Sequence, residues 1–183
     1  MKRRSIDLMA GSAILILIAI DQIIKVIVKG YYGVKVPIIQ NKIYFKPTLN
    51  SNYSWLNSMF KFGWGKAFHI IINVIFLFLA YFTFKYIYNK SKEKLSIKLL
   101  EVFLISGILC SLIDKVFWNG SLDYIYLKGL FVFDLKDCYI TVFEIEAITL
   151  LIRNRASISK ISNKELIKDY IKFIKSNFTT SSN

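Results

Sequence analysis

The chain alternates long apolar runs with short polar connections. Crossing a bilayer as a helix takes about 20 mostly apolar residues, and four runs approach that length: 8–28, 68–88, 97–116 and 138–152. The fourth run is the shortest and contains two glutamates. The pattern therefore predicts an all-α membrane protein with four transmembrane helices.

The connection 29–67 differs from a plain linker. Apolar and polar residues alternate in VKVPII (34–39) and KIYFK (42–46), as they do in short strands. Further along, SWLNSMFKFGWG (54–65) supplies aromatic side chains of the kind that gather at a membrane interface. Ordinary interfacial anchoring accounts for these aromatics equally well, and we keep both interpretations.

Composition and charge support the membrane assignment. Hydrophobic residues make up 55% of the chain, and the net charge is +13. The basic residues flank the apolar runs instead of forming a stripe on a soluble fold, which argues against a nucleic-acid-binding protein. Cys110 and Cys138 lack zinc-site spacing, and His69 is the single histidine, so we expect no metal site. A disulfide between the cysteines stays open.

The distribution of lysine and arginine predicts the orientation. Basic residues concentrate at the N-terminus, between the second and third runs, and after residue 152. By the positive-inside rule both termini are cytoplasmic, and the loops 29–67 and 117–137 face outward. We therefore divide the chain into a membrane domain, 1–155, and a basic cytoplasmic tail, 156–183.

The tail has a pattern of its own. Ile167, Ile171 and Ile174 recur at helical spacing among lysines. Such a segment suits a helix that lies on an anionic inner leaflet, although an unstructured basic tail is a close alternative.

Carboxylates within apolar runs are costly and usually face the interior of a helix bundle. With the orientation above, Asp21, Asp114 and Asp137 all fall in the half of the bilayer that faces outward. Asp21 and Lys25 stand four residues apart on one helix face, so we expect them to neutralise each other.

Asp114 and Asp137 end one predicted helix and begin the next. Two carboxyl groups in a low-dielectric pocket cannot both ionise and would share a proton. One would then act as a base toward water while the other donates to a carbonyl, as in aspartic proteases. Two unrelated carboxylates at helix ends are the plainer alternative.

Five stretches resemble, in order, the motifs of the lipoprotein signal peptidases (signal peptidase II), which are four-helix membrane aspartyl proteases. They are DQIIK (21–25) for D-Q-x-x-K, NSNYSW (50–55) for N-x-G-A-A-F, GILCSLIDK (107–115) for G-x-x-G-N-x-x-D-R, Asp123-Tyr124 for V-x-D-F, and FDLKD (133–137) for F-N-x-A-D. The resemblance spans residues 8–152.

The resemblance implies roles for particular residues. Asp114 and Asp137 would be the catalytic pair. Substrate-binding or structural support would come from Asp21, Lys25, Asn50, Ser111, Lys115, Asp123 and Asp134. It also implies a small extracytoplasmic β-like cradle and a short helix over the active site.

The chain departs from these motifs at several positions. Cys110, Ser111, Lys115 and Asp134 stand where the family has Gly, Asn, Arg and Asn, and Asn52, Tyr53 and Ser54 replace Gly-Ala-Ala. Lysine does not replace arginine where a forked donor is needed. Asp134 adds a negative charge near the catalytic pair, which should raise the proton affinity of that pair.

These observations predict a peptidase of the bacterial inner membrane. It would remove signal peptides from diacylglyceryl-modified prolipoproteins, before the lipidated cysteine, with no metal or cofactor. We expect a monomer whose partners are prolipoproteins and membrane lipids, without nucleic acid, and whose active site lies near the outer face.

Two other functions stay open. The first is a non-catalytic or altered-specificity lipopeptide-binding membrane protein on the same scaffold, which the motif departures motivate. The second, a small transporter subunit, is less favoured because run 68–88 has few polar residues, among them Asn73 and Thr83, and so no polar stripe that could line a pore.

Overall fold

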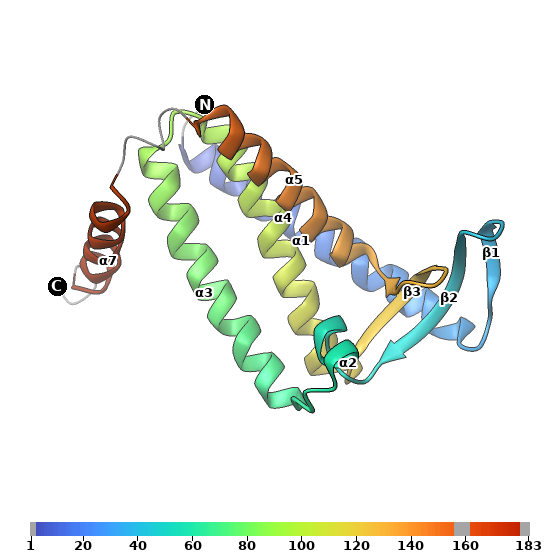
Figure 1. The fold of residues 1–183 in the computed structure, drawn as a ribbon. Coiled ribbons are helices and arrows are strands. Elements are labelled where there is room, and N and C mark those ends of the chain that lie inside the picture. The colour runs from blue at the N-terminus through green and yellow to red at the C-terminus, as the bar shows by residue number, and fades with distance from the viewer. Residues whose placement is uncertain (1–2, 156–161, 180–183) are drawn as a thin grey trace.

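The computed structural model describes residues 3–155 and 162–179 (Figure 1). Its long helices are α1 (Arg3–Val28), α3 (Lys66–Lys90), α4 (Lys94–Ile113), α5 (Leu135–Arg153) and α7 (Asn163–Thr179). The shorter elements are η1 (Lys29–Tyr31), β1 (Val36–Ile39), β2 (Ile43–Asn50), α2 (Trp55–Phe60), the π-helical turn η2 (Asp114–Trp118), β3 (Ser121–Leu127) and β4 (Val132–Phe133). The protein is mostly helical, with one small antiparallel sheet.

Helix α4 is the centre of the bundle and packs against α1, α3 and α5. The core cluster is apolar and joins α3, α4 and α5 through Phe84, Leu100, Ile108 and Leu150, among others. The opposite faces of the helices expose large apolar side chains, for example Leu15 at 69% and Ile152 at 70%. Such faces are stable in lipid and not in water, so the bundle belongs in a membrane.

Among the described residues, three helices are long and apolar enough to span a bilayer: Arg4–Tyr31, Lys66–Lys90 and Lys94–Trp118. They correspond to the first three predicted spans. The fourth predicted span, 138–152, lies in α5, which is not among these three helices because Lys136 and Asp137 add to the charge of Glu144 and Glu146. The count of four spans therefore stays a prediction.

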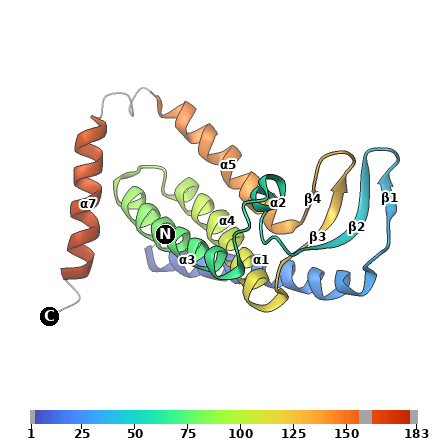
Figure 2. The same ribbon diagram turned by 60° about the horizontal axis from the view of Figure 1, so that its bottom comes forward.

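The four strands form one sheet in the order β1-β2-β3-β4, each pair antiparallel (Figure 2). The β1–β2 hairpin matches the strands expected at 34–39 and 42–46. The register between β2 and β3 shifts between Phe45 and Thr48, where Pro47 has no N–H to give to the ladder. The sheet lies at the end of the bundle where α1 ends and α5 begins.

Strands β3 and β4 correct the sequence analysis, which treated 117–137 as a loop. The segment 121–127 pairs with β2 along its length, from Ser121 opposite Asn50 to Leu127 opposite Ile43. Its first four residues are buried, so β3 has no clear alternation that a sequence pattern could reveal.

The tail contains a helix, α7, in its described part, as the spacing of Ile167, Ile171 and Ile174 predicted. It lies beside α3 on the side away from the sheet (Figure 1). The Tyr170 hydroxyl is 2.8 Å from that of Thr83, and Phe178 stacks on Phe82. Residues 156–161 and 180–183 of the predicted tail lie outside the described residues.

We predict that Gly107→Ala destabilises the protein whereas Gly11→Ala does not. A Cβ at Gly107 would lie 2.8 Å from Ile140 Cγ1 on α5, while a Cβ at Gly11 meets nothing within 4 Å. Overpacking of this kind costs about 1–3 kcal/mol, and replacing an unconstrained helical glycine by alanine favours the helix by up to about 1 kcal/mol.

Thermal unfolding of both variants in detergent measures the difference. Equal unfolding temperatures for the two variants would contradict a close α4–α5 contact at Gly107.

Candidate active site

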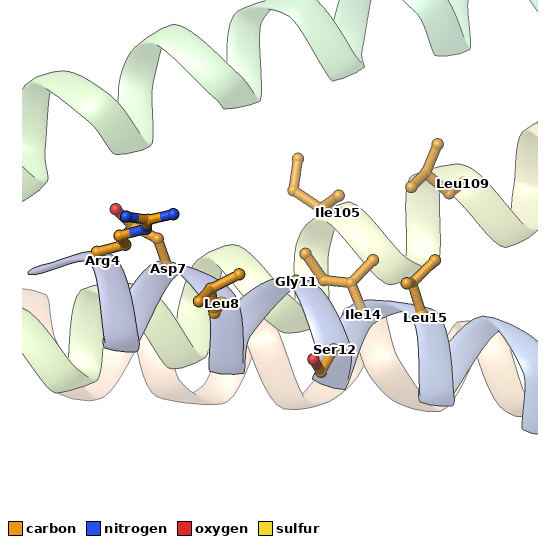
Figure 3. A pocket seen from close by; sticks show the side chains of 9 residues that line it. All are labelled: Arg4, Asp7, Leu8, Gly11, Ser12, Ile14, Leu15, Ile105 and Leu109. Atoms are coloured by element: carbon orange, nitrogen blue, oxygen red, sulfur yellow. The ribbon is translucent and has the colours of Figure 1, made fainter.

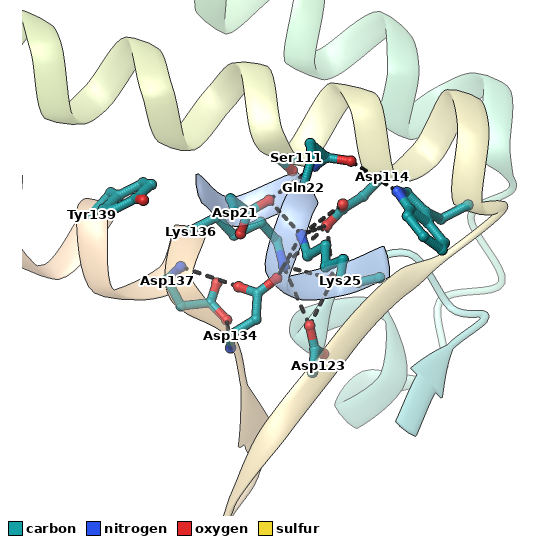
Figure 4. Close-up of polar contacts among 12 residues, drawn as sticks. Asp21, Gln22, Lys25, Ser111, Asp114, Asp123, Asp134, Lys136, Asp137 and Tyr139 are labelled. Atoms are coloured by element: carbon teal, nitrogen blue, oxygen red, sulfur yellow. Dashed lines mark hydrogen bonds and ion pairs between the residues drawn. The ribbon is translucent and has the colours of Figure 1, made fainter. Parts of the chain in front are cut away.

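A buried ammonium group collects carboxylates from three parts of the chain (Figure 4). Lys25 Nζ lies 2.9 Å from Asp21 Oδ2, 2.7 Å from Asp114 Oδ1 and 2.8 Å from Asp134 Oδ2. All four side chains are fully buried. The predicted pairing of Asp21 with Lys25 is confirmed, but Lys25 also holds the ends of α4 and α5.

A second ammonium group, that of Lys136, lies beside the first. Lys136 Nζ is 2.6 Å from Asp134 Oδ2 and 3.3 Å from Asp123 Oδ1 and from Asp114 Oδ2. It also donates a hydrogen bond to Ser121 Oγ at 2.7 Å. Two buried cations therefore stabilise a larger group of carboxylates that could not remain ionised alone.

Asp134 fixes the start of α5. Its side chain accepts a hydrogen bond from the backbone N–H of Asp137, and its own backbone N–H donates to Asp137 Oδ2 at 3.1 Å. This reciprocal capping box is a common way to begin a helix. Because Asp137 is the third residue of α5, the cap orients the carboxylate of Asp137.

The end of the bundle next to the sheet contains a pocket of about 510 Å³. Its polar walls come from β2, α4, η2, β3 and α5, and include Asn50, Ser111, Lys115, Asp123, Asp137 and Glu144. Apolar walls come from Trp55, Phe131 and Ile140, and the rings of Trp55 and Phe131 are arranged edge to face.

Asp123 and Asp137 are the carboxylates of most interest here. Oxygen atoms of Asp123, Asp134 and Asp137 lie within 4.8 Å of one another, and Asp123 and Asp137 both line the pocket. Such a carboxylate cluster could hold a metal ion, but Lys136 already supplies a positive charge to Asp123 and Asp134.

The electrostatic environment differs between two of the carboxylates outside the helices. Burial raises the pKa of Asp123, although the ammonium of Lys136 opposes this effect. Burial also disfavours ionised Asp134, but Lys136 and Lys25 outweigh it and lower the pKa of Asp134 below its ordinary value.

Asp114 does not pair with Asp137 in the way that the sequence predicted. Both of its oxygens accept hydrogen bonds of 2.7 Å from Lys25, and the side chain is fully buried. Among the residues that the structure describes, those lining the pocket include Asp123 and Asp137 but not Asp114. The reason is that Asp114, at the start of η2, points toward α1 and is bound there to Lys25.

The remaining predicted residues lie around the pocket. Asn50, at the end of β2, accepts a hydrogen bond from the backbone N–H of Asn52 at 3.0 Å. Ser111 Oγ accepts a hydrogen bond of 2.7 Å from Lys115. These three side chains, of Asn50, Ser111 and Lys115, all line the pocket.

Sequence reasoning missed Lys136 and Ser121. The one sequence signal for Lys136 is its position directly before Asp137. Ser121 hydrogen-bonds to Asp123 Oδ1 at 2.7 Å, a contact that depends on β3 and had no sequence signal.

A larger cavity, of about 960 Å³, lies between α1 and α4 (Figure 3). Its walls are mainly apolar, from residues such as Leu8, Ile14 and Leu109. None of the predicted site residues lines it, so the smaller pocket is the better candidate for chemistry.

Comparison with known proteins gives a family and a fold. The model of a family described as "Signal peptidase (SPase) II" matches residues 13–153. No curated protein sequence matches this chain. The family match contains every site residue predicted from the sequence.

Two solved structures described as bacterial membrane enzymes, determined by the in meso method at 2.3 and 1.9 Å resolution, resemble the fold. The first has a TM-score of 0.67 and 19% identity, over 81% of this chain and 90% of that chain. The second has a TM-score of 0.66 and 19% identity, over 80% of this chain and 94% of that chain.

We predict that Lys25→Met lowers the free energy of unfolding by about 3–5 kcal/mol, because it leaves the carboxylates of Asp21, Asp114 and Asp134 without their shared cation. Denaturation in detergent, followed by circular dichroism, measures this loss. Lys42→Met is the matched control, since Lys42 is exposed in the β1–β2 turn. Similar stability of the two variants would show that the Lys25 contacts contribute little.

Proposed function

This chain belongs to the signal peptidase II family, and on that premise we propose that it is a membrane aspartyl endopeptidase. Its substrates would be diacylglyceryl-modified prolipoproteins, cut just before the lipidated cysteine. The observation that carries the proposal is the meeting of two carboxylates, Asp123 and Asp137, on the wall of one pocket at the end of the helix bundle.

We propose Asp123 and Asp137 as the catalytic pair, in place of the pair Asp114 and Asp137 expected from the sequence. A catalytic carboxylate must reach substrate and water, and Asp123 faces the pocket. Asp114 is fully buried and both its oxygens are bound to Lys25. Asp114 then serves as a structural residue that ties α4 to α1.

The two carboxyl groups suffice for peptide hydrolysis if one is ionised and the other protonated. The carboxylate takes a proton from water as the water oxygen bonds to the scissile carbonyl carbon, and the carboxylic acid gives its proton to the carbonyl oxygen. The aspartate that took the proton from water then protonates the leaving nitrogen, while the tetrahedral diol returns a proton to the aspartate that had donated to the carbonyl oxygen. The C–N bond breaks, and both carboxyl groups regain their starting states.

The position of the pocket suits a lipid-anchored substrate. A prolipoprotein enters the bilayer through its apolar signal segment and its acyl chains, so its cleavage site lies at the membrane surface. The sheet lies at one end of the helices (Figure 2), and strands β2, β3 and β4 contribute to the pocket lining. Its Trp55, Phe131 and Ile140 walls can accept apolar residues. By the positive-inside rule this end faces outward.

The wider setting follows from the same proposal. We place the protein in a bacterial inner membrane as a monomer, with both termini in the cytoplasm and α7 on the cytoplasmic side. Four spans would be needed for this arrangement, with α5 crossing beside α4. A helix of its length extends about 28 Å, close to the thickness of the hydrocarbon core.

A second candidate function has one specific observation in its favour. Lys136 Nζ lies 3.3 Å from Asp123 Oδ1, and a cation bound to a catalytic carboxylate could suppress its chemistry. The protein would then bind lipopeptides without cutting them. Cleavage of a diacylglyceryl-modified prolipoprotein by purified protein distinguishes the two functions.

We predict that Asp123→Asn and Asp137→Asn each lower the cleavage rate by at least roughly a thousandfold, because each removes a proton carrier that the other cannot replace. A gel-shift assay in detergent measures release of the signal peptide. Asp169→Asn, on α7, is the matched control and should cleave at the normal rate.

Asp114→Asn tests the revised pair. Its folded fraction should retain cleavage, with reduced stability because a buried ion pair is lost. If Asp114→Asn abolished cleavage per folded molecule while Asp123→Asn retained it, the pair expected from the sequence would be the correct one. If well-folded wild-type protein cut no prolipoprotein, the lipopeptide-binding function would replace the peptidase.

A further inference from the structure

Lys136 places a cation at the wall of the catalytic pocket, next to one member of the proposed pair. The residue is the second of α5, its side chain is buried, and it lines the pocket. Its ammonium group contacts Asp123 and Asp134, and the hydroxyl of Ser121 (Figure 4). The family motif that FDLKD resembles, F-N-x-A-D, has alanine at this position.

The contacts make the two catalytic carboxylates unequal. Asp123 Oδ1 is 3.3 Å from Lys136 Nζ and accepts a hydrogen bond of 2.7 Å from Ser121 Oγ. Within the described residues, the Asp137 carboxylate receives one hydrogen bond, from the backbone N–H of Asp134, and forms no ion pair. An ammonium group and a hydroxyl both favour a negative charge, so ionisation is stabilised at Asp123 more than at Asp137.

We propose that Lys136 is a positioning residue that keeps Asp123 as the ionised member of the pair. Water activation thereby falls to Asp123 and proton donation to Asp137. The inference rests on the proposed peptidase function and goes beyond it, because it assigns separate roles to two carboxyl groups and gives a task to a residue that departs from the family motif.

All charged groups around Asp123 must be considered together. From α5 and its cap it faces Lys136, Asp134 and Asp137. From η2, Lys115 lines the same pocket and interacts with Asp123 through charge, and Asp114 is connected to it through Lys136 and Ser121. Lys25, on α1, forms ion pairs with Asp134 and Asp114. Lys136 is the cation that contacts Asp123 itself, and it opposes the rise in the pKa of Asp123 that burial causes. Its removal should therefore raise the proton affinity of Asp123.

Lys136 could instead serve only to neutralise Asp134, to which it is bound at 2.6 Å. The two roles predict different behaviour with pH. A cation that only neutralises Asp134 changes stability when it is removed, and leaves the ionisation of Asp123 as it was. Removal of a cation that holds Asp123 ionised changes the pH at which the enzyme becomes active.

The first test is the pH dependence of kcat/KM for prolipoprotein cleavage, whose acidic limb reports the group that must be ionised in the free enzyme. Lys136→Met should move this limb to higher pH, with kcat/KM about tenfold lower on the acidic side. Asp134→Asn should move the limb to lower pH, because Lys136 then has one competing carboxylate fewer. An unchanged limb in Lys136→Met, with only stability reduced, would overturn the proposal.

A second variant guards against misfolding. Lys136→Ala combined with Asp134→Asn removes one charge of each sign and gives residues 134 and 136 the identities of the F-N-x-A-D motif. Because Lys136 contacts Asp123 and Asp134 does not, the acidic limb of this double variant should remain above that of the wild type. If the acidic limb of the double variant lay at the same pH as that of the wild type, Lys136 would only compensate for the negative charge of Asp134.

A titration without turnover separates this inference from the peptidase function. The infrared carboxyl band of Asp123, identified by its loss in Asp123→Asn, should titrate at higher pH in Lys136→Met than in the wild type. This result would support the role of Lys136 even in a protein that cuts no prolipoprotein, where the peptidase proposal itself fails. An equal titration midpoint in the two proteins would overturn the role of Lys136.

Discussion

The interaction on which the structure depends is the ammonium group of Lys25 with its three carboxylates. Asp21 comes from α1, Asp114 from the end of α4, and Asp134 from the cap of α5. An uncompensated buried charge costs several kcal/mol, so the three segments are held where their carboxylates can share this cation. The contact joins α1 to the end of α4 and to the cap of α5, and with them it fixes the start of β3 and the first turn of α5.

The pocket is a consequence of that arrangement. Once Asp134 is bound to Lys25, its capping box with Asp137 turns the carboxylate of Asp137 to the pocket wall. Strand β3 leaves η2 and brings Asp123 to the same wall. The chemistry proposed for Asp123 and Asp137 therefore depends on a buried ion pair that takes no part in it.

Four of the departures from the family motifs form two contacting pairs. Lys115 donates a hydrogen bond to Ser111, and Lys136 pairs with Asp134. Read one at a time in the sequence, each substitution removes a familiar group or adds a charge. In the structure each of these four side chains is a partner of another in the same site, so the added charges and polar groups are satisfied locally. This arrangement supports the proposed peptidase site, with altered electrostatics, over a site that has lost its catalytic chemistry.

The sequence by itself determined the helices, because long apolar runs can satisfy their backbone hydrogen bonds in lipid only as helices. It also determined the Asp21–Lys25 pair, since residues four apart on a helix are neighbours, and the β1–β2 hairpin, whose strands alternate. Only the tertiary structure decided which carboxylate accompanies Asp137 in the pocket, that β3 joins the sheet, and that Lys136 contacts Asp123. Each of these depends on where the chain turns after Ile113, and the direction of that turn is set by a contact with Lys25, which lies 89 residues away from Asp114. Local patterns report the neighbours of a residue along one helix or strand, whereas a buried charge takes its partners from whichever segments the fold brings within reach.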